Sequence, residues 1–220
     1  MGTEDVSLEF RGPQPCVFDP GAMVERMSRF PLVVRSCVEG SSRADLRRRS
    51  PRGAWSVGEI LCHLVDEEVE DFGPRLRSTL EDPTRPWPRT DPEGLAIERK
   101  YAEQDPLLAL ARFEQAREGS IAWLREVLAT TPPDDPRWRH AYHHPSGRVI
   151  RAGDLLTSWG AHDMLHLRQI AKRMFEWSWR DGGSGEGGGA AGEGGGGAGE
   201  GGGAAGKGGF SAEYAGPWGA

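Results

Sequence analysis

Apolar residues recur along this chain every three or four positions, the spacing of an α-helix with one buried face. Four segments show this pattern, at about residues 20–39, 57–80, 106–131 and 152–177. Two of them begin with Asp-Pro, and another follows a Ser-x-x-Glu capping box, both of which are strong helix-start signals. Several amphipathic helices in one chain predict an all-α protein, and four of them predict a four-helix bundle.

The segments between these helices are richer in polar residues and prolines. Residues 41–53 are polar and arginine-rich, and we expect a solvated loop there. Residues 82–104 hold four prolines and predict a long loop over one end of the fold, a length more typical of a functional lid than of a tight connection. Residues 132–151 predict an extended segment or a short hairpin. Inside the helices, Pro31 predicts a bend or split, and Pro74 predicts a kink.

The end of the chain has a composition that cannot form a core. Between Gly182 and Gly209, 18 of 28 residues are glycine and none is a large apolar residue. Glycine loses the most backbone entropy on ordering, so this segment is predicted to be a flexible spacer. We therefore expect an irregular lead-in over residues 1–18, a helical bundle over 19–180 and a disordered, low-complexity tail over 181–220.

Charge and cysteine content narrow the function. The formal net charge is -6, whereas a nucleic-acid-binding protein needs a basic face, so we expect no nucleic-acid partner. Cys16, Cys37 and Cys62 form no Cys-x-x-Cys pair, which indicates a reducing compartment. The amino-terminal residues are acidic and no long apolar run follows them, which predicts neither a secretion signal nor a membrane span. A cytoplasmic protein without a membrane partner is the simplest expectation.

The last predicted helix carries the candidate chemistry. His162 and His166 stand four residues apart on its apolar stripe, in line with Trp159 and Ile170. Side chains with this spacing lie about 6 Å apart, so both imidazoles can bind one metal ion. A buried histidine pair needs either hydrogen-bond partners or a metal. His63 is the only histidine on another predicted helix and is therefore the natural third ligand.

Carboxylates accompany His63 on one face of its helix. Three neutral imidazoles suit zinc, nickel or iron(II) and leave positions open for water or substrate. Glu67 is the candidate catalytic residue, and the sequence leaves three roles open for it: a fourth ligand, an orienting partner of an imidazole, or a base for water on the metal. The shared face also holds further acidic residues: Glu59, Asp66 and Glu70.

Two motifs resemble those of the DinB/YfiT-like family (DinB superfamily) of metalloenzymes: Trp55-Ser56-x-x-Glu59-x-x-x-His63-Leu64-x-Asp66-x-Glu68, and His162-Asp163-x-x-His166-x-x-Gln169-Ile170 about a hundred residues later. The resemblance covers about residues 20–177. It implies a four-helix bundle in which the counterparts of His63, His162 and His166 bind a divalent metal. Some members of this family resemble thiol S-transferases that use small thiols. By the same resemblance, the histidines of residues 140–144 are not ligands.

Three hypotheses follow. The leading one is a metal-dependent enzyme that activates a thiol or water at a three-histidine site and acts on a small-molecule substrate, as a transferase or a hydrolase. Its cofactors would be a divalent metal and a small thiol, and a homodimer is compatible with the exposed faces of such bundles. The alternative is a non-catalytic module that binds a metal or ligand, with the tail tethering a partner. A third reading has the histidines hydrogen-bonded in a metal-free core.

Overall fold

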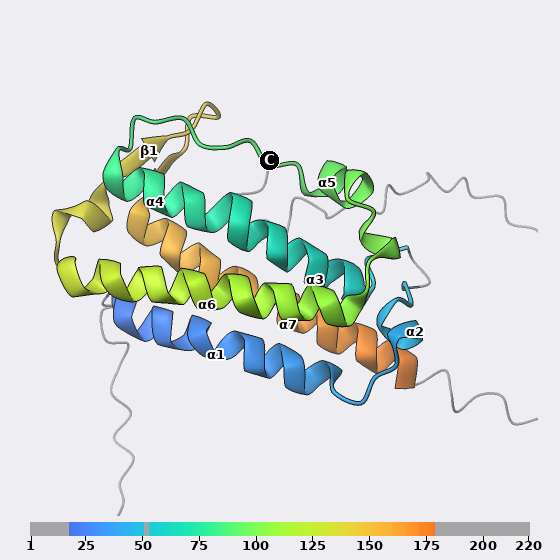
Figure 1. Ribbon diagram of the computed structural model, residues 1–220. Helices are drawn as coiled ribbons and strands as arrows, with labels where there is room; N and C mark the ends of the chain where they lie inside the picture. The colour runs from blue at the N-terminus through green and yellow to red at the C-terminus, as the bar shows by residue number, and fades with distance from the viewer. Residues whose placement is uncertain (1–17, 51–52, 179–220) are drawn as a thin grey trace, which may run out of the picture.

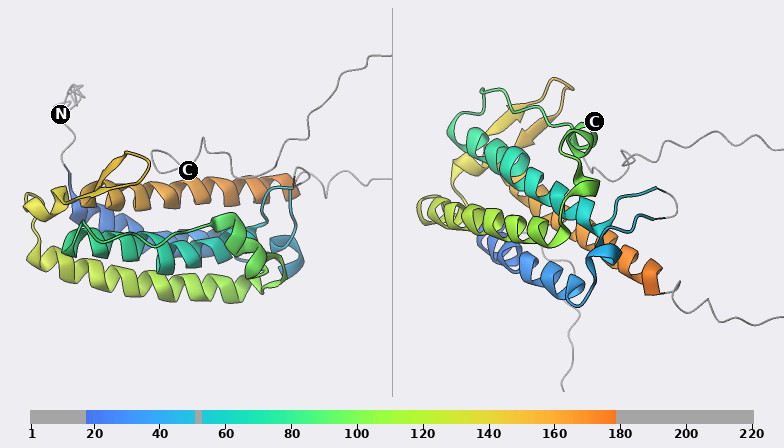
Figure 2. Two further views of the ribbon diagram at one scale, coloured as in Figure 1. Left: turned by 90° about the horizontal axis from the view of Figure 1, so that it is seen from above. Right: turned by 45° about the vertical axis from the view of Figure 1, so that its right-hand side comes forward.

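The protein folds as a bundle of four helical rods that run side by side (Figures 1 and 2). A computed structural model describes residues 18–50 and 53–178 of the chain. The predicted all-α four-helix bundle is confirmed. The second rod is continuous but composite, with a π-helical turn between two α-helices. The four rods are α1 (Pro20–Val38), α3–η1–α4 (Val57–Asp66, Glu67–Phe72 and Gly73–Glu81), α6 (Pro106–Thr130) and α7 (Ala152–Ser178).

The direction of the rods explains the long connection over residues 82–104. In Figure 1 the rod α3–η1–α4 and helix α6 run in one direction, whereas α1 and α7 run in the other. The chain leaves α4 at one end of the bundle and must enter α6 at the opposite end. Residues 82–104 therefore travel the length of the bundle as a crossover connection, packed against α3.

Two segments expected to be structureless contain short helices. Residues 41–53 include α2 (Arg43–Leu46), whose first turn is capped by the Ser42 hydroxyl accepting from the backbone N–H of Asp45. Residues 82–104 include α5 (Pro92–Glu98) and the 3-10 turn η2 (Tyr101–Glu103). Helix α5 begins at Asp91-Pro92, the same start signal as at the longer helices, with the Asp91 carboxylate accepting from the N–H of Gly94. The loop expectation was wrong at both places.

The hairpin expected within residues 132–151 is present. A 3-10 turn, η3 (Pro136–Arg139), leads into β1 (Ala141–His143), which pairs antiparallel with β2 (Val149–Arg151). Tyr142 lies opposite Ile150, and both side chains are buried against the end of the bundle. The hairpin closes the end at which α4 and α6 finish and α7 begins (Figure 1).

Neither Pro31 nor Pro74 splits the rod that contains it. Helix α1 runs unbroken through Pro31, which is buried within it. The irregularity in the second rod lies just before Gly73-Pro74, as the six-residue π-helix η1. A π-helical turn adds residues to a helix without ending it, and such turns are frequent at functional sites. Hydrophobic periodicity alone could not place it.

Two apolar clusters fill the bundle, and a polar layer separates them along three of the four rods. On α7 this layer lies between Trp159, which packs in one cluster, and Ile170, which packs in the other. On the second rod it lies between Leu64 and Phe72, and on α6 between Phe113 and Ile121. Fully burying one large aliphatic or aromatic side chain contributes about 1.5–3 kcal/mol, so the two clusters supply the stability that holds the polar layer in place.

No helix among the described residues is long and apolar enough to cross a membrane. The predicted glycine-rich tail, residues 181–220, lies outside the described residues, as does the lead-in up to residue 17.

Candidate metal centre

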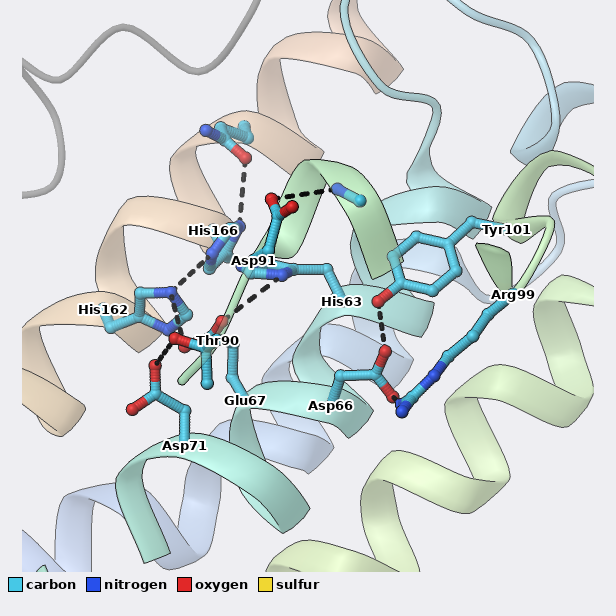
Figure 3. Close-up of polar contacts among 12 residues, drawn as sticks. His63, Asp66, Glu67, Asp71, Thr90, Asp91, Arg99, Tyr101, His162 and His166 are labelled. Carbon is cyan, nitrogen blue, oxygen red and sulfur yellow. Dashed lines mark hydrogen bonds and ion pairs between the residues drawn. The ribbon is translucent and has the colours of Figure 1, made fainter. Parts of the chain in front are cut away.

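The three histidines predicted as ligands come together in the polar layer. His63 projects from α3, and His162 and His166 project from α7 (Figure 3). One candidate ligand atom from each imidazole lies within 4.8 Å of the other two. Within residues 18–50 and 53–178, no other group of three or more His, Cys, Asp or Glu side chains meets this condition.

The separation of the nitrogens suits shared coordination. Nε2 of His162 and Nε2 of His166 are 3.0 Å apart, which is also the length of a hydrogen bond between the two rings. Two ligands on one ion, each at about 2.0–2.1 Å from it, lie roughly 3 Å apart. The ring of His63 completes the triangle, with its centroid 4.8 Å from that of His166 and 5.5 Å from that of His162. Three imidazoles on two facing helices are a donor set that fits a zinc, nickel or iron(II) ion.

One hydrogen bond selects the nitrogen that His166 offers. The side-chain oxygen of Gln169 lies 3.0 Å from Nδ1 of His166, so Nδ1 donates its proton to the amide oxygen. Nε2 then carries the lone pair and points toward His162. Histidine ligands usually have such a partner, which fixes the tautomer and the ring orientation. Gln169 belongs to the second of the two sequence motifs, but the sequence does not indicate this role for it.

Burial keeps the three imidazoles neutral. The pKa of His63 and that of His162 are lowered well below the usual value, first by burial and then by the neighbouring His166. Burial also lowers the pKa of His166 to about 4, although its bond to Gln169 opposes the shift. At neutral pH each ring therefore keeps a lone pair available to a metal ion.

Glu67 is the carboxylate that reaches the histidines. It is the first residue of η1, and its Oε1 lies 3.6 Å from Nδ1 of His63 while its Oε2 lies 3.9 Å from Nε2 of His162. Burial raises the pKa of Glu67 well above the usual value, and the charge of the neighbouring Asp71 adds to the shift. Glu67 is therefore a buried carboxyl group with a high proton affinity beside two of the three rings.

The other acidic residues predicted on this face have different partners. Glu59 is buried, caps its own helix and forms an ion pair with Arg49. Asp66 and Glu70 turn toward the crossover segment and bind Arg99 at 2.6 Å and 2.7 Å. Of the carboxylates predicted on this face, only Glu67 therefore lies beside the histidines.

Asp71 links this carboxylate to the crossover segment. Its Oδ1 lies 2.7 Å from Nε of Arg75, and its Oδ2 accepts from the Thr90 hydroxyl at 3.3 Å. The same hydroxyl accepts from Arg75 at 2.8 Å. Tyr101, at the end of the segment, donates its hydroxyl proton to Asp66. Polar groups thus attach residues 82–104 to η1 and its flanks (Figure 3), and the buried Tyr101 ring and the partly buried Trp87 and Leu95 add apolar contacts with the core.

The histidines of the hairpin region stay apart from the centre, as expected. His140 contacts the backbone oxygen of Leu80 through Nδ1 at 3.1 Å. His144 forms a hydrogen bond of 2.7 Å with the Ser146 hydroxyl within its own turn. His143 is exposed on β1. None of the three joins the group formed by His63, His162 and His166.

The fold and the site define a helical bundle with a buried three-histidine centre between facing helices. The chain belongs to the DinB superfamily, whose family model matches residues 29–170. A curated relative, the YfiT protein of Bacillus subtilis, is 20% identical over 155 residues, which span 69% of this chain and 83% of the relative.

A solved structure shares the fold. It is that of YfiT from Bacillus subtilis, described as a probable metal-dependent hydrolase with an unusual four-helix bundle topology. It superimposes with a TM-score of 0.64 at 18% sequence identity, covering 77% of this chain and 94% of that chain. Likeness at this identity shows a common architecture, and the chemistry has to be argued from the residues of this chain.

Proposed function

We propose that this protein is a divalent-metal-dependent enzyme in which His63, His162 and His166 hold the ion. The observation that carries the proposal is the convergence of three neutral imidazoles in the interior, with the two Nε2 atoms of α7 only 3.0 Å apart. A purely structural core would more economically fill this layer with apolar side chains. The relative described as a metal-dependent hydrolase supports the same class of chemistry.

A divalent ion bound at such a site lowers the pKa of a coordinated water or thiol and so supplies a nucleophile near neutral pH. The protein's own contribution is to hold three ligand nitrogens in one orientation and to keep further positions free. Gln169 holds the ring of His166 through Nδ1, and Trp55 and Phe72 pack near the rings of His63 and His162 at centroid distances of 5.1 Å each.

We assign the proton transfer to Glu67. Its two oxygens face His63 and His162, which places the carboxylate beside the space that the three imidazoles share. A carboxyl group at this place can accept a proton from a bound nucleophile and return it, as general acid–base catalysis requires. Of the three roles that the sequence left open for Glu67, the base is the one that its high proton affinity favours.

Hydrolysis of a small molecule is the reaction class that the relative's description favours, with water as the nucleophile. Transfer to a small thiol would use the same ligands and the same base, with a sulfur in place of the water oxygen. The two reactions therefore differ in which nucleophile the site admits, and both require Glu67 to take up one proton.

The test is elemental analysis of the full-length protein purified without chelators, followed by turnover screens with water alone and with added small thiols. We expect close to one zinc, nickel or iron ion per chain, and loss of that ion in His162→Ala. The matched control is His144→Ala, which removes a histidine outside the centre. Retention of the metal in His162→Ala, or its absence from the parent, would refute the ligand set. Bound metal without turnover in any screen would favour the non-catalytic binding module.

A further inference from the structure

Arg117 is the most completely bonded side chain in the polar layer. It lies in the middle of α6 and is only 1% exposed. Its Nε and Nη2 donate to the two oxygens of Glu68 at 2.8 Å and 2.9 Å, and its Nη1 and Nη2 donate to Asp163 at 2.7 Å and 2.8 Å. Nη1 also donates to the backbone oxygen of Met27 at 3.2 Å. Each of the five N–H donors of the guanidinium thus has an acceptor.

These contacts join all four rods of the bundle. Arg117 belongs to α6, Glu68 to η1 of the second rod, Asp163 to α7 and Met27 to α1. Glu68 and Asp163 are themselves buried, at 3% and 1% exposure, so no solvent path weakens the pairing. We call Arg117, Glu68 and Asp163 the arginine clamp.

The clamp is built on the residues adjacent to the metal centre. Glu68 directly follows Glu67, and Asp163 directly follows His162. Consecutive side chains on a helix point roughly 100° apart, so one member of each pair faces the histidines while the other faces the guanidinium. The guanidinium of Arg117 holds the carboxylates of Glu68 and Asp163. It thereby also restrains the neighbouring backbone that carries Glu67 and His162.

A chain of side-chain contacts also leads from the clamp to the imidazole ring of His162. The indole N–H of Trp159 donates to Glu68 at 3.1 Å. Its ring stacks on Phe72 at a centroid distance of 5.8 Å and an interplanar angle of 10°, and Phe72 in turn packs on His162 at 5.1 Å. Glu68 is thus connected to His162 in two ways. One runs through Arg117 to Asp163, the neighbour of His162 on α7, and the other runs through the rings of Trp159 and Phe72.

Stability alone does not account for the clamp. Buried ion pairs are expensive to desolvate, and well-packed apolar replacements are often equally stable. Two carboxylates also face one guanidinium, so the three side chains together carry a net negative charge. A negative surplus is unfavourable in a metal-free interior and favourable next to a bound divalent cation.

We propose that Arg117 is a positioning residue for the three-histidine centre: it holds Glu67 and His162 in register across the bundle and anchors the negative charge that balances a divalent ion. This inference rests on the proposed function, because it assumes that the three histidines bind a metal. Arg117 itself does not touch the ligand nitrogens.

The test uses Arg117→Lys, which keeps the charge but loses the planar fork. Co2+ is the probe, because its visible absorption reports coordination geometry as well as binding. The full-length parent and variant are compared for Co2+ affinity by competition with a coloured chelator, for the Co2+ spectrum, and for unfolding by denaturant without metal. Leu46→Ala is the control for lost stability, since Leu46 is fully buried in α2 at one end of the bundle and outside the clamp.

We expect Arg117→Lys to bind Co2+ at least 10-fold more weakly and with an altered spectrum, the size of effect seen when partners of metal ligands are removed. Leu46→Ala should lose stability but keep the parent's affinity and spectrum. If Arg117→Lys does not fold, the test uses Glu68→Gln, which preserves the side-chain shape and removes one charge of the clamp. Its Co2+ affinity and Co2+ spectrum are then compared with those of the parent. A folded clamp variant with the parent's affinity and spectrum overturns the positioning role. Failure of the parent itself to bind Co2+ refutes the metal centre instead.

Discussion

Gln169 and His166, one turn apart on α7, are joined by a hydrogen bond of 3.0 Å between the amide oxygen and Nδ1 of the imidazole. Because this bond holds the proton on Nδ1, Nε2 is the nitrogen that His166 can offer to a metal. Gln169 is partly exposed, so we expect its side chain to orient the His166 ring while adding little to the stability of the apolar core.

Replacing Gln169 by Leu is therefore expected to weaken metal binding by about 10–100-fold while changing the free energy of unfolding by less than about 0.5 kcal/mol. Competition for Co2+ against a chelator measures the first quantity, and denaturant unfolding measures the second. Lys172→Leu, on the exposed side of the same helix, is the matched control. An unchanged Co2+ affinity in Gln169→Leu would show that the hydrogen bond does not select the ligand nitrogen.

Changing Glu67 to Gln should separate metal binding from catalysis. If Glu67 is the base, the variant keeps the three imidazoles and hence the metal, but kcat falls by about 10²–10⁴-fold. Glu70→Gln is the control, because Glu70 lies on the same turn and binds Arg99 instead of facing the histidines. Loss of metal from Glu67→Gln would assign Glu67 to the ligand set and contradict its role as the base.

The metal-free protein should lose stability on acidification because of the buried histidines. In the unfolded chain histidine titrates near pH 6.5, whereas burial holds the pKa of folded His166 at about 4. Between these values the unfolded state binds more protons, so the free energy of unfolding falls as pH falls, by up to about 1.4 kcal/mol per pH unit for each histidine.

The raised pKa values of Glu67 and Asp71 act in the opposite direction, because the folded state then takes up their protons first. The measurement is therefore the difference in unfolding free energy between the parent and His166→Asn, which keeps both carboxyl groups. This difference should change between about pH 6.5 and pH 4 in the sense that the parent loses more stability. A difference that is constant over this range would mean that His166 is not buried in its neutral form.

Weakening the attachment of the crossover segment should open residues 82–104 without unfolding the bundle. Arg99→Met removes ion pairs to Asp66 and Glu70, each worth up to about 1 kcal/mol at a partly exposed position. Amide hydrogen exchange in this segment is expected to accelerate by roughly fivefold, with exchange in α6 unchanged. Lys100→Met, which loses only an exposed contact of 3.7 Å with Glu103, serves as the control. Faster exchange in α6 would mean that the segment is part of the global fold and cannot open as a lid.

Much of the fold was readable because its signals are local. Asp19-Pro20, Ser56 with Glu59, and Asp105-Pro106 each start a helix where the sequence predicts one, since a cap needs only residues within a turn of each other. The same holds for the pair of histidines on α7, whose spacing places them on one face. The helix at residues 92–98 has the same kind of signal, Asp91-Pro92, although the prolines around it favour a loop.

The parts that were not predicted depend on contacts far apart in the chain. The π-helical turn has no hydrophobic period of its own and could not be foreseen. The partners of the acidic side chains lie on other elements as well: Glu67 meets His162 on α7, whereas Asp66 and Glu70 meet Arg99. Arg117 finds its carboxylates 49 and 46 positions away, at Glu68 and Asp163. A single sequence gives an arginine on a helix and does not say which partners it meets.

The crossover topology also has a consequence for the order of assembly. His63 leaves the ribosome about a hundred residues before His162, and α7 is the last element of the bundle to be synthesised. Until α7 docks, His63 and the buried carboxylates of η1 lack their partners on α7 and border the open groove between α1 and the second rod that α7 will fill. A metal ion bound at this centre would then join α3 to α7 and stabilise the docking of the last helix.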